Sequence, residues 1–139
     1  MKKKSILIAD DDGDLLTILA TRCQTLGCEI IRSSDGLEAE LELLLKHDHE
    51  QFPDLVILDI EMPFDSGLSI CEELKRDAIL SRIPVIILTG RQDAATVRHC
   101  QDLGAVYIHK SPDMWSKLEP VIAELLEMPN DALSEALPL

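Results

Sequence analysis

Residues 54–68 read DLVILDIEMPFDSGL, an apolar run followed at once by an acidic residue. The run at 54–58 is short and almost free of polar residues, which is typical of a strand buried on both faces of a parallel sheet. Asp59 comes directly after it, and Ser66 is suited to cap a helix that includes Leu68. The stretch therefore predicts a strand that ends on a carboxylate, then a loop, then a helix.

Four more apolar runs of this kind occur along the chain, at residues 5–9, 28–31, 84–88 and 105–108. Segments with the three-and-four apolar spacing of helices alternate with the runs, at residues 15–26, 37–45, 68–74, 92–102 and 114–125. Strict alternation of strands and helices is typical of an α/β protein with a parallel sheet. We expect a flavodoxin-like, doubly wound sheet of five strands in the order 2-1-3-4-5, with five helices.

Several helix ends are indicated by capping residues. Asp12 and Asp35 are expected N-caps, and Gly27 is the expected C-cap of the first helix. Ser111 followed by Pro112 indicates an N-cap with proline at the first helical position of the last helix.

The segment 92–102 is the weakest predicted helix. Its apolar set consists only of Ala94, Ala95, Val97 and Cys100. A helix with so thin an apolar stripe packs shallowly. We therefore expect it to be a mobile or partner-facing element.

Length and charge limit the class of protein. The 139 residues suit one domain, which we expect over 1–127, with 128–139 as a C-terminal tail or linker because the apolar pattern stops there. A net charge of −13 argues against binding to nucleic acid or to an acidic membrane surface. The apolar run 5–9 is too short for a signal peptide or a membrane span, so a cytoplasmic location is expected.

Residues able to handle phosphate or metal stand at the carboxyl ends of the predicted strands, where ligands of open α/β sheets bind. They are Asp10 and Asp11 after strand one, Asp59 after strand three, Thr89 after strand four and Lys110 after strand five. Each alone has an ordinary explanation as a helix cap, a structural threonine or a solvated lysine. The joint order along the chain is far more specific.

The three carboxylates would crowd one pocket. Like charges ~4 Å apart repel by roughly 4 kcal/mol at a surface-type dielectric. A hard divalent cation such as Mg²⁺ offsets that repulsion, and Lys110 adds a cationic donor. A pocket of this composition suits a phosphoryl group, with Asp59 as the nucleophile that forms an aspartyl phosphate.

Four stretches carry a family resemblance: ILIADDDGDLL at 6–16, DLVILDIEMPFDSGL at 54–68, PVIILTG at 84–90 and GAVYIHK at 104–110. They resemble the receiver domain of bacterial two-component response regulators, including the chemotaxis-regulator type. The resemblance covers roughly residues 4–126. It implies a phosphorylation-controlled switch rather than a conventional enzyme.

The resemblance implies a role for each site residue. Asp59 is similar in position to the phosphorylated aspartate. Asp11 matches a direct ligand of Mg²⁺ (or Mn²⁺), Asp10 a ligand acting partly through water, and the backbone carbonyl of Glu61 a third protein ligand. Lys110 matches the invariant lysine of the family.

Thr89 and Tyr107 match the switch residues of the family. The resemblance implies that phosphorylation, from a partner sensor histidine kinase or a histidine phosphotransfer protein, draws Thr89 inward and lets Tyr107 rotate. The face built from helix four, strand five and helix five then changes, which controls an unknown downstream protein or output domain, and some relatives form homodimers through it. Tyr107 also has a simpler interpretation, as an ordinary half-buried strand aromatic.

Two features depart from or refine the family pattern. Ser111 stands directly after Lys110, where proline is usual, and Pro112 comes one residue later. Glu61 and Arg91 each lie two residues beyond a site residue, at positions that in the family help to set the lifetime of the aspartyl phosphate. A charged pair there would shield the pocket from water, which predicts a moderately long-lived phosphoryl group.

Three other functions use similar residues. A phosphatase of the haloacid dehalogenase type has the same chemical groups, and Glu61 resembles its general acid, but its nucleophile comes first along the chain and a cap domain does not fit in this length. An interaction module without phosphate chemistry would not need the complete set. Nucleotide or flavin binding would need a glycine-rich loop, whereas DDDG stands at 10–13.

Overall fold

The computed structural model describes residues 3–44 and 52–128. The strands are β1 (Ser5–Ala9), β2 (Glu29–Ser33), β3 (Leu55–Leu58), β4 (Val85–Thr89) and β5 (Val106–His109). The helices are α1 (Gly13–Thr25), α2 (Gly36–Leu43), α3 (Gly67–Arg76), the short 3₁₀ helix η2 (Leu80–Arg82), α4 (Ala94–Asp102) and α5 (Met114–Leu125). Leu45 of the predicted second helix and tail residues 129–139 lie outside the described residues. None of the helices described has the length and hydropathy that a membrane crossing requires.

All four strand pairs are parallel, and the order is β2-β1-β3-β4-β5. The predicted fold class and strand order are confirmed. In the register, Ala9 of β1 lies opposite Leu58 of β3. Asp10 and Asp59, each the next residue, therefore leave the same edge of the sheet side by side.

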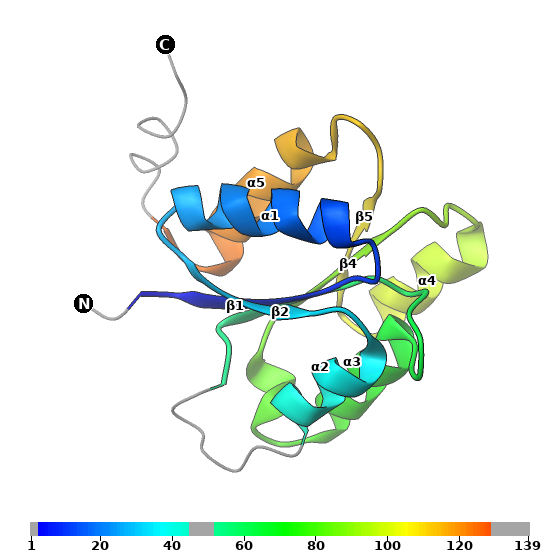
Figure 1. Cartoon of the computed structure of the whole chain (residues 1–139). Helices are drawn as coiled ribbons and strands as arrows, with labels where there is room; N and C mark the ends of the chain where they lie inside the picture. Colours follow the sequence, from blue (N-terminus) through cyan, green and yellow to red (C-terminus); the bar gives the residue numbers. More distant parts are fainter. Residues whose placement is uncertain (1–2, 45–51, 129–139) are drawn as a thin grey trace.

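Helices cover both faces of the sheet (Figure 1). Side chains alternate between the two faces because the strand period is two residues. In β1, Ile6 and Ile8 pack with α1 and α5, whereas Leu7 and Ala9 pack with α2 and α3. This two-sided burial explains why the central strands read as unbroken apolar runs.

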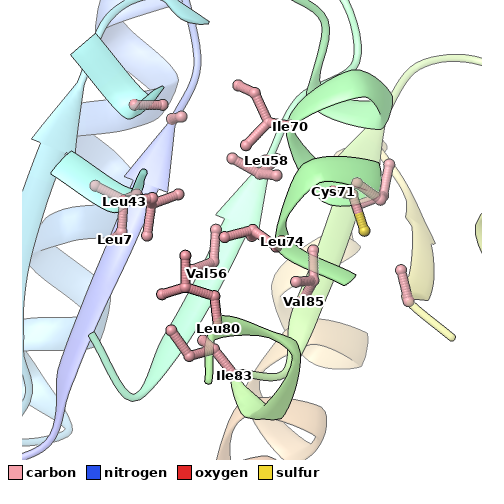
Figure 2. Close-up of a cluster of buried hydrophobic side chains, with 14 of the residues drawn as sticks. Leu7, Leu43, Val56, Leu58, Ile70, Cys71, Leu74, Leu80, Ile83 and Val85 are labelled. Carbon is pink, nitrogen blue, oxygen red and sulfur yellow. The ribbon is translucent and has the colours of Figure 1, made fainter. Parts of the chain in front are cut away.

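Figure 2 shows the core on the α2 and α3 side. Val56 and Leu58 of β3 share this cluster with Ile70 and Leu74 of α3, and all four side chains are fully buried. The packing holds β3 and the start of α3 together, and Asp59 lies on the connection between them.

The edge strands are less buried than their sequences suggest. Ile30 and Ile31 of β2 are only half-buried, and so are Val106 and Tyr107 of β5. An edge strand has a neighbouring strand on one side only, so its side chains have fewer packing neighbours than those of a central strand. The apolar runs marked the strands correctly but did not distinguish edge from centre.

The predicted caps of the first helices are confirmed. Asp12 accepts hydrogen bonds from the amides of Asp14 and Leu15, and Asp35 accepts one from Glu38. Ser66 Oγ likewise accepts one from the amide of Ser69 (3.1 Å). At the other end of α1, Gly27 follows the last capping residue with φ 90°, a conformation that favours glycine.

The prediction for the start of α5 is wrong. The helix begins at Met114, three residues after Ser111, and Asp113 occupies the N-cap position without a side-chain capping bond. The Ser111 hydroxyl instead donates to Asp113 Oδ1 (2.6 Å), and the Ser111 carbonyl accepts from the Met114 amide (3.0 Å). These bonds close a turn over Pro112 before the helix starts, which the cap signal alone does not reveal.

The α4 helix is shallowly packed, as predicted. Thr96 and Cys100 are its buried residues, whereas Ala94 and Ala95 are exposed, so these two alanines were wrongly assigned to the apolar face. Thr96 is buried at low cost because its hydroxyl donates to the carboxylate of Asp93.

Candidate functional site

Asp59 lies directly after β3, and its position is held by the sheet. Its amide donates to the carbonyl of Ala9 on β1 (3.0 Å). The carboxylate is almost fully buried: Oδ1 accepts from the Ile60 amide (2.7 Å), and Oδ2 accepts from Lys110 Nζ (3.0 Å). Both oxygens are therefore held in fixed positions at the edge of the sheet.

Asp10 is the corresponding residue after β1. Its amide donates to the Ser33 carbonyl (3.1 Å), and its Oδ1 accepts from the Asp12 amide (2.9 Å). Its Oδ2 lies 2.8 Å from Lys110 Nζ. One ammonium group thus pairs with both buried carboxylates, Asp10 and Asp59.

Three carboxylates form a cluster that suits a divalent cation. Asp10, Asp11 and Asp59 each offer an oxygen, and these oxygens lie within 4.8 Å of one another. With the Lys110 ammonium, the group has a net charge of −2, which one divalent cation balances. Carboxylate oxygens are the ligands of hard cations such as Mg²⁺ and Mn²⁺, and Asp11 is exposed, which gives an entry from solvent.

The pKa values of Asp59 and Lys110 reflect this arrangement. Burial raises the pKa of Asp59, its ordinary value being 3.8, because desolvation disfavours the charge; Lys110 opposes the rise and Asp10 adds to it. Burial alone would lower the pKa of Lys110, but its hydrogen bonds to Asp10 and Asp59, together with the negative charges of these carboxylates, outweigh burial and raise it. The lysine therefore remains charged at neutral pH. The negative charge of Asp59 is not fully compensated by Lys110, and a bound cation would stabilise it.

A cavity of ≈ 390 Å³ lies beside Asp59. It is lined by Asp59, Glu61, Thr89, Gly90, Arg91 and Lys110. The structure thus brings the carboxylate, hydroxyl and ammonium groups expected from the sequence to one polar cavity. Glu61 and Arg91 stand at it as well, and the Arg91 guanidinium pairs with Asp93 (Nε–Oδ1 3.5 Å).

Thr89 and Tyr107 both contact the loop that follows β4. Thr89 is buried, and its Oγ1 accepts from the Arg91 amide (3.2 Å). Tyr107 is half-buried, and its hydroxyl donates to the Arg91 carbonyl. The Thr89 hydroxyl is therefore hydrogen-bonded to the backbone of the loop, and Thr89 also lines the cavity.

Gly67 is a site residue that the sequence reasoning missed. A Cβ atom at this position would lie 2.1 Å from the Asp59 carbonyl oxygen, and the Gly67 amide donates to the Ile60 carbonyl (3.1 Å). The first turn of α3 thus rests directly on the backbone of Asp59. A glycine at the start of a predicted helix was the available signal, because glycine there often marks a close backbone approach.

Fold and site together define a flavodoxin-like α/β protein with a cluster of acidic side chains and a lysine at the carboxyl ends of β1, β3 and β5. The family model of the response regulator receiver domain matches residues 6–116. The chain belongs to this family, the receiver domains of response regulators in two-component systems, which act as signalling switches.

Named relatives agree with the family. The chain is 36% identical over 130 residues to the probable transcriptional regulator ycf27 of Guillardia theta, covering 94% of this chain and 48% of that protein. It is 31% identical over 90 residues to the alkaline phosphatase synthesis transcriptional regulatory protein PhoP of Bacillus subtilis, covering 65% and 35%. The chain spans about half the length of the first of these relatives and about a third of the second.

Solved structures agree as well. The Mn²⁺-bound form of response regulator Rcp1 matches with a TM-score of 0.79 and 26% identity, over 98% of this chain and 99% of that one. The receiver domain of a DNA-binding response regulator from Colwellia psychrerythraea 34H matches with a TM-score of 0.79 and 31% identity, over 91% and 100%. The expected family resemblance is confirmed.

Proposed function

We propose that residues 1–127 form a cytoplasmic phosphoacceptor domain that receives a phosphoryl group on Asp59. The donor is a phosphohistidine of a partner sensor histidine kinase or histidine phosphotransfer protein. The observation that carries the proposal is the buried Asp59 carboxylate, 3.0 Å from Lys110 Nζ, clustered with Asp10 and Asp11, beside a small polar cavity. The domain acts as a switch and turns over only its own phosphate.

In the proposed reaction, a carboxylate oxygen of Asp59 bonds to phosphorus while the bond from phosphorus to the donor imidazole nitrogen breaks. The electron pair of that bond leaves with the imidazole, which takes up a proton from solvent. The Lys110 ammonium and the Thr89 hydroxyl, both at the cavity, donate to phosphoryl oxygens as their charge develops.

Asp10, Asp11 and Asp59 would hold a Mg²⁺ or Mn²⁺ ion, together with the backbone carbonyl of Glu61. The cation supplies charge neutralisation and a fixed position for phosphoryl oxygens. The net charge of −2 around the cluster supports this proposal, as does the Mn²⁺ reported for Rcp1. Asp10 and Asp59 both pair with Lys110, whereas Asp11 is exposed to solvent.

Phosphorylation would act on the switch through Thr89. A rotation of its side chain towards a phosphoryl group at Asp59 would move Oγ1 away from the Arg91 amide, from which it accepts a hydrogen bond. The loop before α4 then loses the hydrogen bond between the Arg91 amide and Thr89. The hydrogen bond from the Tyr107 hydroxyl to the Arg91 carbonyl remains, and it breaks if Tyr107 rotates. A phosphoryl group thereby favours one state of the α4–β5–α5 face over the other.

That face has features of a readout surface for a downstream protein, an output domain or a second copy of the chain. A cavity of ≈ 680 Å³ lies along α4, lined by residues that include Ala94, Val97 and Arg98. A half-exposed pair, His99 Nε2 to Glu72 Oε1 at 2.9 Å, joins α4 to α3. With so little of α4 buried, modest forces are sufficient to shift it.

The net charge of −13 makes direct contact with nucleic acid by this domain unfavourable. The relatives named as transcriptional regulators are about twice as long as this chain. We therefore propose that any effect on transcription passes through a separate partner or output domain.

The proposal is tested by incubating the chain with acetyl phosphate and Mg²⁺ and measuring the intact mass. We expect a gain of one phosphoryl group in the wild-type chain and none in Asp59→Ala. Asp54→Ala is a matched control, because Asp54 lies at the opposite end of β3 and accepts from the Ser5 amide. A gain that persists in Asp59→Ala contradicts the proposal, as does its absence from the wild-type chain.

A further inference from the structure

Phe64 is the most exposed large apolar side chain among residues 3–44 and 52–128. Its relative exposure is 81%, whereas the next four, Ile18, Leu37, Leu41 and Ile79, are between 46% and 52% exposed. Single exposed apolar residues are ordinary on protein surfaces, so exposure alone assigns no role. The backbone and the location of Phe64 set it apart from the other four.

The backbone at Phe64 is strained. Its φ is 75°, a region that bulky residues rarely adopt, and the Asp65 amide donates to the Pro63 carbonyl across it (3.0 Å). This combination is the positive-φ γ-turn, which is rare and strained. The Gly36 amide of α2 also donates to the Pro63 carbonyl (2.9 Å), and Asp65 Oδ1 accepts from the Ser66 amide (2.9 Å). The turn is therefore fixed, although the ring that it displays has little packing.

The strain has no structural benefit that a smaller residue would lack. Glycine adopts a positive φ freely, and asparagine tolerates it better than phenylalanine. A phenylalanine at this turn lowers stability through its backbone, and its exposed ring adds little packing to offset that loss. Strain of this kind is concentrated at functional sites.

The turn stands beside the phosphoacceptor. The loop 59–67 begins at Asp59 and returns to it, since the Gly67 amide bonds to the Ile60 carbonyl. Phe64 is three residues from Gly67, so their Cα atoms lie within about 11 Å. One side of a standard protein interface covers roughly 800 Å², a disc with a radius of about 16 Å. An interface of this size centred near Asp59 would therefore extend as far as Phe64.

We infer that Phe64 is a specificity-determining contact for the phosphodonor protein, whose apolar surface beside the phosphohistidine packs on the exposed ring. The inference rests on the proposed function. Phe64 does not line the cavity that Asp59, Thr89 and Lys110 share, so a small phosphodonor has no need of it. Aromatic residues that become buried in an interface commonly dominate its binding energy. The ring selects the donor, and the cavity performs the chemistry.

The test compares two donors on the same variants. The donors are acetyl phosphate with Mg²⁺ and the phosphorylated cytoplasmic part of a sensor kinase chosen because it phosphorylates the wild-type chain. For Phe64→Ala we expect the second-order rate constant from the kinase to fall about tenfold, the scale of losing an interface anchor, with the acetyl phosphate rate unchanged. Phe64→Tyr keeps the ring and should retain most of the kinase rate. Ile79→Ala, which removes an exposed apolar side chain between α3 and β4, should match the wild type with both donors.

Phe64→Gly tests whether a lower kinase rate is caused by misfolding, because glycine adopts the positive φ without strain. It should unfold at a higher temperature than the wild type and still accept phosphate slowly from the kinase. Equal kinase rates for Phe64→Ala and the wild type overturn the inference, and so does an equal loss with both donors. Self-association that Phe64→Ala abolishes, with an unchanged kinase rate, assigns the ring to a second copy and also overturns it. If acetyl phosphate does not phosphorylate the wild-type chain and no sensor kinase that does so is found, the proposed function itself is contradicted, and the inference with it.

Discussion

The side chains of Thr89 and Tyr107 form hydrogen bonds with the backbone amide and the backbone carbonyl of the same residue, Arg91. The Thr89 hydroxyl accepts from the Arg91 amide (3.2 Å), and the Tyr107 hydroxyl donates to the Arg91 carbonyl. The Thr89 side chain is buried beside the cavity at Asp59, and the Tyr107 side chain is half-buried on the edge strand β5. Arg91 thus links the cavity to the α4–β5 surface through two hydrogen bonds.

Removing the Tyr107 hydroxyl should loosen this link. For Tyr107→Phe we expect a loss of about 1 kcal/mol from the local stability of the loop, the usual net value of a hydrogen bond. Amides of residues 90–93 should exchange with deuterium about fivefold faster, measured by hydrogen-exchange mass spectrometry. The rate of phosphorylation by acetyl phosphate should not change, because Tyr107 does not line the cavity. Unaltered exchange would make Tyr107 an ordinary strand aromatic.

The contact between Gly67 and Asp59 predicts a severe effect of a single methyl group. For Gly67→Ala the added Cβ would meet the Asp59 carbonyl oxygen at 2.1 Å, so either α3 or the backbone of Asp59 must move. We expect about 1–3 kcal/mol of destabilisation in urea unfolding, typical of overpacking, and slower phosphorylation. Gly13→Ala is the matched control, since a Cβ there has no heavy atom within 4 Å. Similar effects of the two substitutions would contradict the close approach.

The carboxylate cluster predicts opposite effects of Asp11→Asn with and without a cation. Without Mg²⁺ the variant should be more stable than the wild type, because one repelling charge is gone. Adding Mg²⁺ should stabilise the wild type, by about 2.7 kcal/mol at roughly 100 times its dissociation constant, and stabilise the variant much less. Thermal unfolding with EDTA and with Mg²⁺ measures both effects. Asp14→Asn, at the exposed first turn of α1, is the control and should respond to Mg²⁺ as the wild type does.

Glu61 and Arg91 stand at the cavity and are expected to slow hydrolysis of the aspartyl phosphate. The double variant Glu61→Ala, Arg91→Ala should lose its phosphoryl group several-fold faster than the wild type, because water reaches the phosphorus more easily. Decay of the phosphorylated mass after removal of acetyl phosphate measures the lifetime. Glu73→Ala, Arg76→Ala removes an exposed acid and base from α3 and is the matched control. Equal lifetimes of all three proteins would show that the charged pair has no shielding role.

The raised pKa of Glu40 predicts a pH dependence of stability that does not involve Asp59. A hydrogen bond with Asp65, together with burial and the charges of Asp65 and Glu73, raises the pKa of Glu40 from 4.5 to about 7. The folded state then binds this proton more tightly than the unfolded state. The resulting stabilisation is complete below pH 4.5 and is lost as the pH rises towards about 7.

The substitution Glu40→Gln keeps a hydrogen-bond donor at every pH. Its advantage in urea unfolding over the wild type should therefore be larger at pH 8 than at pH 5. Glu124→Gln, on α5, should follow the wild-type pH profile. A constant difference between Glu40→Gln and the wild type across this range would contradict the raised pKa.

Much of the fold was predictable because the central strands are buried on both faces. The runs at 5–9 and 54–58 differ from the observed β1 and β3 by at most one residue. Edge strands were less clear, since β2 continues to Ser33, two residues beyond its apolar run. Burial leaves a strong mark on the sequence at the centre of a sheet and a weaker one at its edge.

Features that depend on one close contact were not predictable in this way. Ser111 carries a cap signal, but its hydroxyl is bound by Asp113 and the helix starts later. The sequence around Phe64 does not indicate a positive φ, because this conformation is fixed by hydrogen bonds from the Asp65 amide and from α2 to the Pro63 carbonyl. Local preference is outweighed wherever the surrounding structure supplies a better partner.

The sequence by itself determined the alternation of strands and helices, the parallel sheet and the set of polar residues at its carboxyl edge. These follow from periodicity and from the residue after each apolar run, which are local properties of the chain. Only the tertiary structure decided that Lys110 pairs with both Asp10 and Asp59, that Gly67 rests on the Asp59 carbonyl, and that two hydroxyls share Arg91. Such contacts join segments far apart in the chain, and distances of a few ångströms are set by packing that no local pattern encodes.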